Sequence, residues 1–245
     1  MKPTPNFPPD GGPLLAFGAH PDDIEFGCGG VIARETGAGR AAHLVICSRG
    51  ESSTRGTPAR RAREARRGAA LLGATLEFAN LGGDAHFETG AAHGLTLARC
   101  IRRVRPGIVL APSVAENQHP DHAKLGRLVR EAARLARYGG VKELRALKAH
   151  AITHLFFYAV TPEAEPIDLA KILVDVSAPG VMTAWTAAME AHASQQRTRH
   201  YVELQLARAR VHGLRAGVGH AIALFPNDPL VFSSLAALDR AARRF

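Results

Sequence analysis

Residues 14–30 read LLAFGAHPDDIEFGCGG and place an apolar run, a group of ionisable side chains and a glycine-rich segment directly after one another. Leu14–Gly18 is short and apolar, which predicts a buried strand. The small and apolar residues from about 27 to 36 predict a helix, and the glycines at 37 and 39 predict its end. A buried strand that leads through a polar turn into a helix is the unit from which α/β folds are built.

The same alternation of strand and helix continues along the chain. Apolar runs predict further strands at 43–47, 75–81, 108–111, 153–160 and 172–176. Helices are expected at 58–72, 96–105, 123–137 and 184–211, the last with a break near Ser194. Short continuous apolar runs are typical of parallel strands that are buried on both faces. The sequence therefore predicts an α/β protein with a Rossmann-like, doubly wound, mostly parallel sheet and helices on both faces.

Length and composition favour one folded domain. The chain has 245 residues, of which 46% are hydrophobic and 22% charged, the balance of a globular protein. We expect a proline-rich tail at residues 1–13 and a single domain at residues 14–245. The tail has no apolar segment of the secretory type. The longest apolar runs, such as residues 155–160, are far shorter than the ~20 residues of a membrane helix.

Cysteine usage points to a reducing compartment. Cys28, Cys47 and Cys100 are too few and too scattered for a disulfide framework, and none forms a Cys-x-x-Cys pair. We therefore expect a cytoplasmic protein.

The chain is strongly basic, with 31 Lys and Arg against 22 Asp and Glu and a net charge of +9. This balance raises the alternative of a basic, non-catalytic module that binds nucleic acid through residues 55–67. Aromatic residues make up only 6% of the chain, too few for the base stacking that single-strand binders use. The charges are mostly arginines scattered over helix-like segments, which is typical of solvated helix faces. We therefore expect neither a nucleic-acid nor a membrane partner.

Two clusters of ionisable residues follow predicted strands. His20-Pro21-Asp22-Asp23 comes after the first strand, and His119-Pro120-Asp121-His122 comes after the strand at 108–111. We expect each proline to stand at the first helical position and to pre-set the turn, so that residues three apart share a face. Either cluster alone would be interpreted as a helix cap. Two such clusters at the ends of two strands indicate a shared site.

The expected topology brings the two clusters together. In a doubly wound sheet of order 3-2-1-4-5, strands one and four are neighbours, and ligands bind outside their carboxyl ends where the winding reverses. Two histidines and one carboxylate with an open position form a typical catalytic zinc site. We expect His20, Asp23 and His122 to be the metal ligands. Zinc is the first choice of metal, and ferrous iron would suit the same ligands.

The remaining residues of the clusters have the chemistry that an activated water requires. Asp22 is the candidate general base, because a carboxylate beside a metal-bound water can take its proton. His119 is expected to stabilise the developing oxyanion or to protonate the leaving amine. Asp121 is expected to hold a histidine in the tautomer that binds the metal.

Two other kinds of site are disfavoured. Gly27-Cys28-Gly29-Gly30 is rich in glycine, but it lacks the G-x-G-x-x-G spacing of a dinucleotide-binding turn. Cys28 is expected to be a small buried thiol. The serines at 48, 52 and 53 show no G-x-S-x-G elbow, which argues against a serine hydrolase.

The segment AFGAHPDDIEFGCGG at 16–30, together with HPDH at 119–122, resembles the PIG-L/LmbE-like family of zinc-dependent deacetylases. The resemblance covers nearly the whole chain. SRGESSTRGT at 48–57 is similar to a loop of bacterial members that act in bacillithiol synthesis, and residues 80–82 and 193–195 are also similar to the family. The resemblance implies a metal-dependent hydrolase that removes the N-acetyl group from an N-acetylglucosamine-type conjugate and releases acetate and a free amine.

The resemblance also implies roles for individual residues. It gives the same metal ligands as above, with Asp22 as general base and His119 as the charged partner of the transition state. It adds Arg61 and Tyr201 as contacts to the substrate. Arg61 is one of six arginines between residues 55 and 67, and Tyr201 could instead be a packing aromatic. The implied partner is a small N-acetylated amino-sugar conjugate, and a homo-oligomer is left open.

Overall fold

The predicted apolar runs form one mixed sheet in the part of the chain that the structure describes. The computed structural model describes residues 11–116, 119–196, 200–238 and 240–242. Its strands are β1 (Leu14–Gly18), β2 (Ala42–Ile46), β3 (Thr75–Phe78), β4 (Ile108–Pro112), β5 (His154–Tyr158), β6 (Ile172–Asp175) and β7 (Ala221–Pro226). They are ordered β3-β2-β1-β4-β5-β7-β6. The first five are parallel, as predicted, which confirms the order 3-2-1-4-5.

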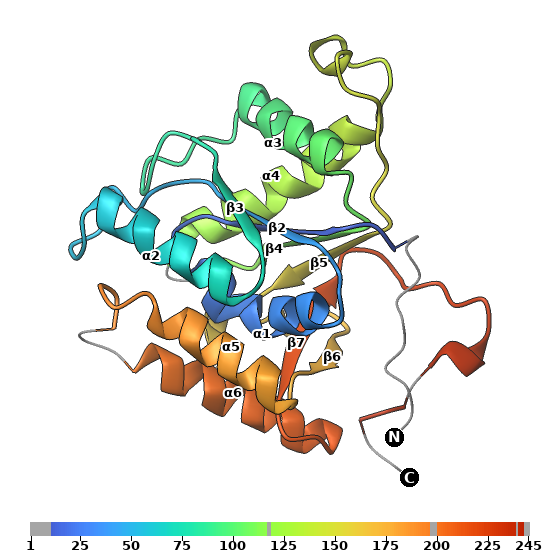
Figure 1. Ribbon diagram of the computed structural model, residues 1–245. Helices are drawn as coiled ribbons and strands as arrows, with labels where there is room; N and C mark the ends of the chain where they lie inside the picture. The colour runs from blue at the N-terminus through green and yellow to red at the C-terminus, as the bar shows by residue number, and fades with distance from the viewer. Residues whose placement is uncertain (1–10, 117–118, 197–199, 239, 243–245) are drawn as a thin grey trace.

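Helices cover both faces of this sheet (Figure 1). They are α1 (Asp23–Gly37), α2 (Pro58–Leu71), α3 (Ala91–Val104), α4 (Pro120–Arg137), α5 (Pro179–Glu190) and α6 (Tyr201–Ala216). Short 3-10 helices lie at η2 (Lys142–Leu144), η3 (Pro162–Ala164) and η4 (Leu235–Ala237). One buried apolar cluster packs α1, α2, α5 and α6 on one face, and a second packs α3 and α4 on the other. The doubly wound α/β fold is thereby confirmed.

The last third of the fold departs from the expectation. The apolar run of β7 is not among the predicted strands, and it lies antiparallel between β5 and β6. The helix expected at 184–211 is two helices, because α5 ends at Glu190 and α6 begins at Tyr201, on either side of the expected break near Ser194. Between the two helices, His192 pairs with Glu25 of α1 and Ser194 bonds to Glu64 of α2, contacts that a continuous helix does not account for.

Several helix starts also lie earlier than predicted. α1 begins at Asp23, not near residue 27, and α3 begins at Ala91, not at 96. α4 begins at Pro120, where proline stands at the first helical position as expected. The equivalent expectation for Pro21 is wrong, because α1 starts two residues after it. Polar residues in these first turns hide the helical periodicity.

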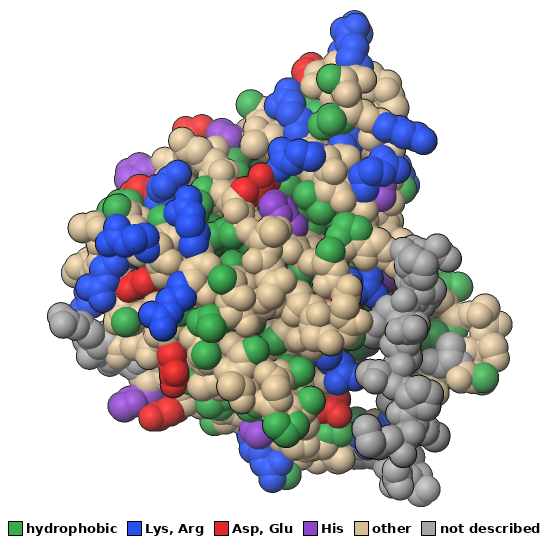
Figure 2. Space-filling model, viewed as in Figure 1, with side chains coloured by type: hydrophobic (Ala, Val, Ile, Leu, Met, Phe, Trp, Pro, Cys, Tyr) green, Lys and Arg blue, Asp and Glu red, His purple; other side chains and the backbone are tan. Residues whose placement is uncertain are grey.

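Basic side chains lie in separate groups on the face seen in Figure 2. One group lies over α2, where Arg60, Arg63, Arg66 and Arg67 are exposed. Another lies over the loop after α4, which exposes Lys142, Arg145 and Lys148. Acidic and apolar side chains separate the two groups on this face. The distribution matches the solvated helix faces that the sequence predicts.

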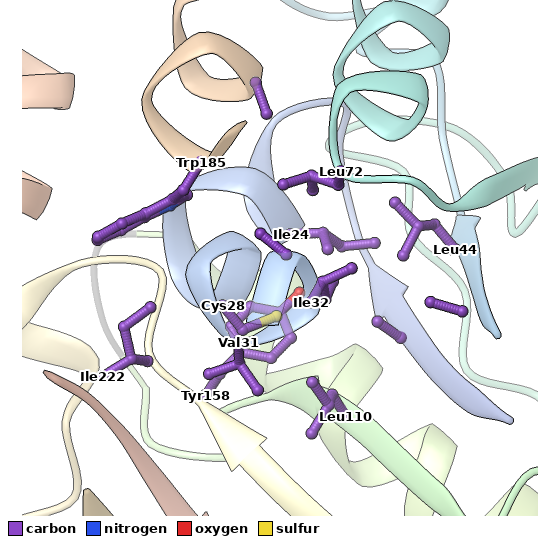
Figure 3. Close-up of a cluster of buried hydrophobic side chains, with 14 of the residues drawn as sticks. Ile24, Cys28, Val31, Ile32, Leu44, Leu72, Leu110, Tyr158, Trp185 and Ile222 are labelled. Atoms are coloured by element: carbon purple, nitrogen blue, oxygen red, sulfur yellow. The ribbon is translucent and has the colours of Figure 1, made fainter. Parts of the chain in front are cut away.

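The glycine-rich run of α1 is a packing surface (Figure 3). A Cβ atom on Gly27 would overlap the Tyr158 ring, and one on Gly29 would lie 2.8 Å from Trp185 Cδ1. Tyr158 and Trp185 also donate hydrogen bonds to the Phe17 carbonyl at 2.7 Å and the Glu25 carbonyl at 2.8 Å. The glycines therefore let two large aromatic side chains approach the helix backbone closely.

The start of the described chain is tied to the domain, since Arg40 donates to the carbonyls of Gly11 and Gly12. Most of the expected proline-rich tail at 1–13 lies outside the described residues, so the domain boundaries stay a prediction. No described helix is both long enough and apolar enough to span a membrane. All three cysteines are buried and free, which agrees with the interpretation of Cys28 as a buried thiol.

Candidate active site

The carboxyl ends of β1 and β4 bring the two polar clusters together. These strands are paired directly, with Leu14 opposite Ile108. The ring centroids of His20 and His119 lie 4.3 Å apart, and those of His20 and His122 lie 5.3 Å apart. The clusters thus form one site from segments a hundred residues apart.

Asp23 is fixed by the turn that ends β1. Its Oδ2 atom accepts hydrogen bonds from the backbone N–H groups of Ala19, at 2.8 Å, and His20, at 2.9 Å. Its Oδ1 atom lies 3.1 Å from His122 Nε2, and Oδ2 lies 3.5 Å from His20 Nδ1. Burial opposes ionisation, but the two histidines outweigh it and hold the pKa of Asp23 well below its ordinary value. Asp23 is therefore a carboxylate with its ligand oxygen pre-positioned.

These separations suit a tetrahedral metal ion. Zinc bonds to nitrogen and oxygen are about 2.0 Å long, which places neighbouring ligand atoms about 3.3 Å apart. The 3.1 Å and 3.5 Å separations around Asp23 lie on either side of that value. Each histidine is thus suitably spaced from Asp23, though from a different carboxylate oxygen, whereas the sets here whose ligand atoms all lie within 4.8 Å of one another are His20, His119 and His122, and His20, Asp84, His119 and Asp121. The ligand set His20, Asp23 and His122 therefore stays a prediction.

The contacts of the Nε2 atom of His20 determine which of its two ring nitrogens can bind a metal. His20 Nε2 lies 3.2 Å from Asp84 Oδ1 and 3.3 Å from Asp121 Oδ2. Two carboxylates at Nε2 favour a proton on that atom, which leaves the Nδ1 lone pair facing Asp23. This is the arrangement expected for the predicted role of Asp121, which also accepts from the Ala85 N–H at 3.1 Å.

Sequence reasoning missed Asp84. It follows β3 in the turn Gly82-Gly83-Asp84, where both glycines have positive φ. It is buried and contacts His20, and its Oδ1 lies 3.8 Å from His119 Nε2. The available signal was its place after the strand next to β2, at the same sheet edge as the other two clusters.

His119 could replace Asp23 in a ligand set, since one ligand atom each from His20, His119 and His122 lie within 4.8 Å of one another. Its side chain is 40% exposed, whereas that of Asp23 is 3% exposed and hydrogen-bonded to the backbone. Burial and the two neighbouring histidines lower the pKa of His119. We therefore keep His119 outside the predicted ligand set, and its role as the charged partner of the transition state stays a prediction.

Asp22 stands next to the ligands in an uncommon backbone conformation. It caps α1 with φ 111°, a value that residues other than glycine rarely adopt. Burial raises its pKa to about 6, although the Arg61 guanidinium, 3.4 Å from Oδ2, opposes this rise. Strained residues of this kind occur at functional sites, and a pKa near the working pH suits a general base.

Arg61 lies in the site but is already engaged. It is buried on α2, and its Nη2 donates to the Pro21 carbonyl at 2.8 Å and to Asp22. Its Nη1 lies 4.0 Å from Asp84 Oδ2. The arginine expected to contact the substrate thus positions Asp22, and its direct contact with substrate stays a prediction.

A cavity of about 380 Å³ opens above these residues. Phe26 and Tyr201 form an aromatic wall, with ring centroids 5.8 Å apart. The rest of the wall carries neutral groups that form hydrogen bonds: Ser52, Ser53, Thr54, Thr161, Gln195 and Gln205. Tyr201 therefore lines the cavity and also packs against Phe26, and its contact with the substrate stays a prediction.

A buried network supports the wall behind Asp22. Glu25 and His192 are both buried and pair at 3.2 Å. Ser194 bonds to Glu64 through its N–H at 3.1 Å and its hydroxyl at 2.5 Å. Gln195 donates to the Arg55 carbonyl at 2.9 Å. These contacts link the end of α5 to α1 and α2.

The comparisons with known proteins agree with this site. The family model described as PIG-L, GlcNAc-PI de-N-acetylase, matches residues 15–133, which include both His-Pro-Asp clusters. Residues 15–133 thus match the PIG-L family. The family resemblance stated from the sequence is thereby confirmed.

Two solved structures share this fold over most of their length. A conserved protein from Thermus thermophilus is 32% identical with a TM-score of 0.78, over 93% of this chain and 99% of that one. The 4-carboxy-2-hydroxymuconate hydratase from Pseudomonas putida is 26% identical with a TM-score of 0.78, over 91% of this chain and 99% of that one.

A deacetylase is also among the relatives of this protein. Diacetylchitobiose deacetylase from Thermococcus kodakarensis is 30% identical over 172 residues, or 65% of this chain and 64% of the relative. The chain thus matches less than two thirds of the length of the curated relatives. Since the relatives include a deacetylase and a hydratase, family membership alone does not fix the reaction.

Proposed function

We propose that this protein is a metal-dependent hydrolase that removes the N-acetyl group from an N-acetylglucosamine-type conjugate. The observation that carries the proposal is a buried His20, Asp23 and His122 set with Asp22 beside it, at the base of a cavity with neutral walls. The proposed ion is zinc, with ferrous iron as the alternative. When bound, the ion supplies Lewis-acid polarisation of the acetamide carbonyl and raises the acidity of a water molecule.

The residues of the chain then have separate tasks. Asp22 takes the proton of the water as its oxygen bonds to the carbonyl carbon, and Arg61 holds the Asp22 carboxylate in place. His119 donates a hydrogen bond to the carbonyl oxygen as that atom gains negative charge. The C–N bond breaks, the amine leaves with a proton from Asp22 or His119, and acetate remains. Asp121 and Asp84 keep His20 oriented.

A hydratase is the second candidate, because one is among the relatives. The substrate in that relative's name, 4-carboxy-2-hydroxymuconate, carries several carboxylates, which require cationic partners. Arg61 is the one Lys or Arg side chain among the described residues that line the cavity, and it is engaged by Asp22 and Pro21. The neutral wall therefore supports an acetamido sugar over a polycarboxylate.

The test is acetate release from a panel of N-acetylglucosamine glycosides with neutral and acidic aglycones, beside hydration of 4-carboxy-2-hydroxymuconate. We expect acetate release that a chelator abolishes and that zinc or ferrous iron restores. Release that is insensitive to the chelator would contradict the metal role. Hydration without acetate release would select the hydratase.

Location and partners belong to the same proposal. The free, buried cysteines support a reducing, cytoplasmic setting. The separate basic groups on the surface support a small-molecule partner over a nucleic acid. The oligomeric state stays open.

A further inference from the structure

Gln205 has a buried side-chain oxygen that the protein itself does not satisfy. The residue lies on α6, one turn after Tyr201, and lines the cavity. It is 2% exposed, and its Nε2 donates to the Val160 carbonyl at 3.0 Å. Its Oε1 accepts no hydrogen bond from any described residue. A buried acceptor without a donor is unfavourable, and a water molecule or a donor group of a bound ligand would satisfy it.

The Val160 contact assigns the two ends of the amide. Because the Val160 carbonyl can only accept, the end that faces it is the NH₂ group and the other end is the oxygen. That oxygen accepts a hydrogen bond and cannot donate one. The matching group on a ligand is therefore a hydroxyl or an N–H, and a carboxylate or phosphate oxygen would be repelled.

The charges of the cavity lead to the same class of ligand. Its described lining carries the carboxylates of Asp22, Asp23 and Asp84 against the Arg61 guanidinium. A divalent cation on the histidine and aspartate ligands would leave the lining close to neutral. No surplus positive charge then remains among the described lining residues for an anionic group.

We propose that Gln205 is a specificity-determining residue that accepts a hydrogen bond from a hydroxyl of an uncharged sugar, held beside the aromatic wall of Phe26 and Tyr201. This inference rests on the proposed deacetylase function and deepens it by naming a neutral polyhydroxylated substrate. A hydroxyl donates to the amide oxygen at Gln205 while the acetamide lies over Asp22 and the metal ligands.

The test combines one variant with deoxy substrates. Gln205→Met keeps the length of the side chain and removes the acceptor. We expect KM for a neutral N-acetylglucosamine glycoside to rise about 2- to 10-fold with kcat little changed. In wild type, one analogue of a panel lacking single hydroxyls should show the same rise. Gln205→Met should show no further rise on that analogue.

Gln196→Met is the matched control. Gln196 also donates its Nε2 to a backbone carbonyl, that of Met189 at 2.8 Å, but it does not line the cavity. We expect wild-type KM on every substrate. Thermal unfolding of both variants reports any loss of fold. If Gln205→Met does not fold, the wild-type deoxy panel decides alone, and a panel without any rise in KM overturns the inference.

Failure of the two proposals can be told apart. If wild type releases acetate but Gln205→Met matches it on the whole panel, Gln205 is not a specificity residue and the deacetylase stands. If wild type releases no acetate, the deacetylase fails. Calorimetry with N-acetylglucosamine then decides on Gln205: weaker binding by the variant supports the inference, and equal or absent binding overturns it.

Discussion

The two His-Pro-Asp clusters differ by one residue in sequence and by much more in structure. In HPDD the helix begins at the fourth residue, Asp23, and Asp22 caps it with φ 111°. In HPDH the helix begins at the second residue, Pro120, so Asp121 lies within the first turn. The third residue of each cluster is an aspartate, yet the pKa of Asp22 is raised to about 6 while that of Asp121 is lowered.

Burial raises the pKa of both carboxyl groups, and at Asp121 other contacts reverse that rise. The side chain of Asp121 is 1% exposed and that of Asp22 is 17% exposed, so burial alone would raise the pKa of Asp121 as well. Burial is opposed at Asp121 by hydrogen bonds from His20 and the Ala85 N–H, which outweigh it. At Asp22 burial outweighs the Arg61 guanidinium. Hydrogen-bond partners therefore favour the anionic form of Asp121, whereas burial favours the protonated form of Asp22.

The largest expected effect is a loss of activity on replacement of Asp22, and it tests whether the two aspartates have different roles. Asp22→Asn removes the general base, so kcat should fall about 10²- to 10⁴-fold while the metal content stays that of wild type. Acetate release and elemental analysis of the purified protein measure the two quantities. Asp228→Asn, an exposed aspartate outside the site, is the control and should match wild type. Loss of metal in Asp22→Asn would place this residue among the ligands.

A smaller effect on metal affinity is expected for the aspartate of the second cluster. Asp121→Asn weakens the hydrogen bond to His20 Nε2, which should reduce metal affinity about 10- to 100-fold. Competition with a chromogenic chelator measures the change, with exposed Asp168→Asn as the control. Unchanged metal affinity in Asp121→Asn would remove this residue from the support of His20.

The pH dependence of stability should have opposite sign at the two positions in the metal-free protein. The folded pKa of Asp22, about 6, lies above its ordinary 3.8, so its burial costs stability increasingly as pH rises from about 4 to 6. Relative to Asp22→Asn, wild type should lose about 1–3 kcal/mol over this interval. For Asp121 the folded pKa is lowered, so its contribution is present above its ordinary value and is lost as pH falls.

Denaturant unfolding of chelator-treated wild type, Asp22→Asn and Asp121→Asn between pH 3 and 7 measures these contributions. For each variant, the difference in the free energy of unfolding from wild type should change with pH, and the two differences should change in opposite directions. If the free energy of unfolding changed with pH in the same way in both variants, the two aspartates would share one environment.

The smallest expected effect is on stability, and it tests the difference in backbone conformation between Asp22 and Asp121. Glycine tolerates the positive φ of Asp22, so Asp22→Gly should relieve strain and change the free energy of unfolding by less than about 1 kcal/mol. Asp121→Gly lies in a helical turn and loses buried contacts, so it should destabilise by about 1–3 kcal/mol. Urea unfolding gives both values. An equal loss in both variants would show that the conformation at Asp22 carries no strain.

Much of this fold could be predicted from local sequence. The parallel half has apolar runs whose order follows from the doubly wound rule, and the clusters after β1 and β4 identify the site. The run of β7 carries the same apolar signal, but its antiparallel place between β5 and β6 depends on long-range packing. The helix starts at Asp23 and Ala91 were missed because polar and small residues in a first turn show no periodicity.

The residues missed in the site share one property. Asp84, Glu25 and His192 become chemically significant only through partners distant in sequence, such as His20 for Asp84. Gln205 carries no motif, and its place in the cavity lining and its unsatisfied oxygen become visible only in the folded protein. Arg61 was expected at the substrate, whereas its contacts with Asp22 and Pro21 follow from the packing of α2 against the β1 turn.

The packing of Tyr158 and Trp185 against the glycines of α1 makes activity vulnerable at positions that no substrate reaches. A side chain at Gly27 would overlap the Tyr158 ring and force the ring or the helix to shift, and the same helix begins at Asp23 with Asp22 as its N-cap. A screen for inactive but folded variants should therefore find Gly27, Gly29 and Gly30 beside the site residues. Such a screen would show that α1 transmits a change in its packing to the site. A shift of the helix at its glycines would displace the carboxylates of Asp22 and Asp23 at its start.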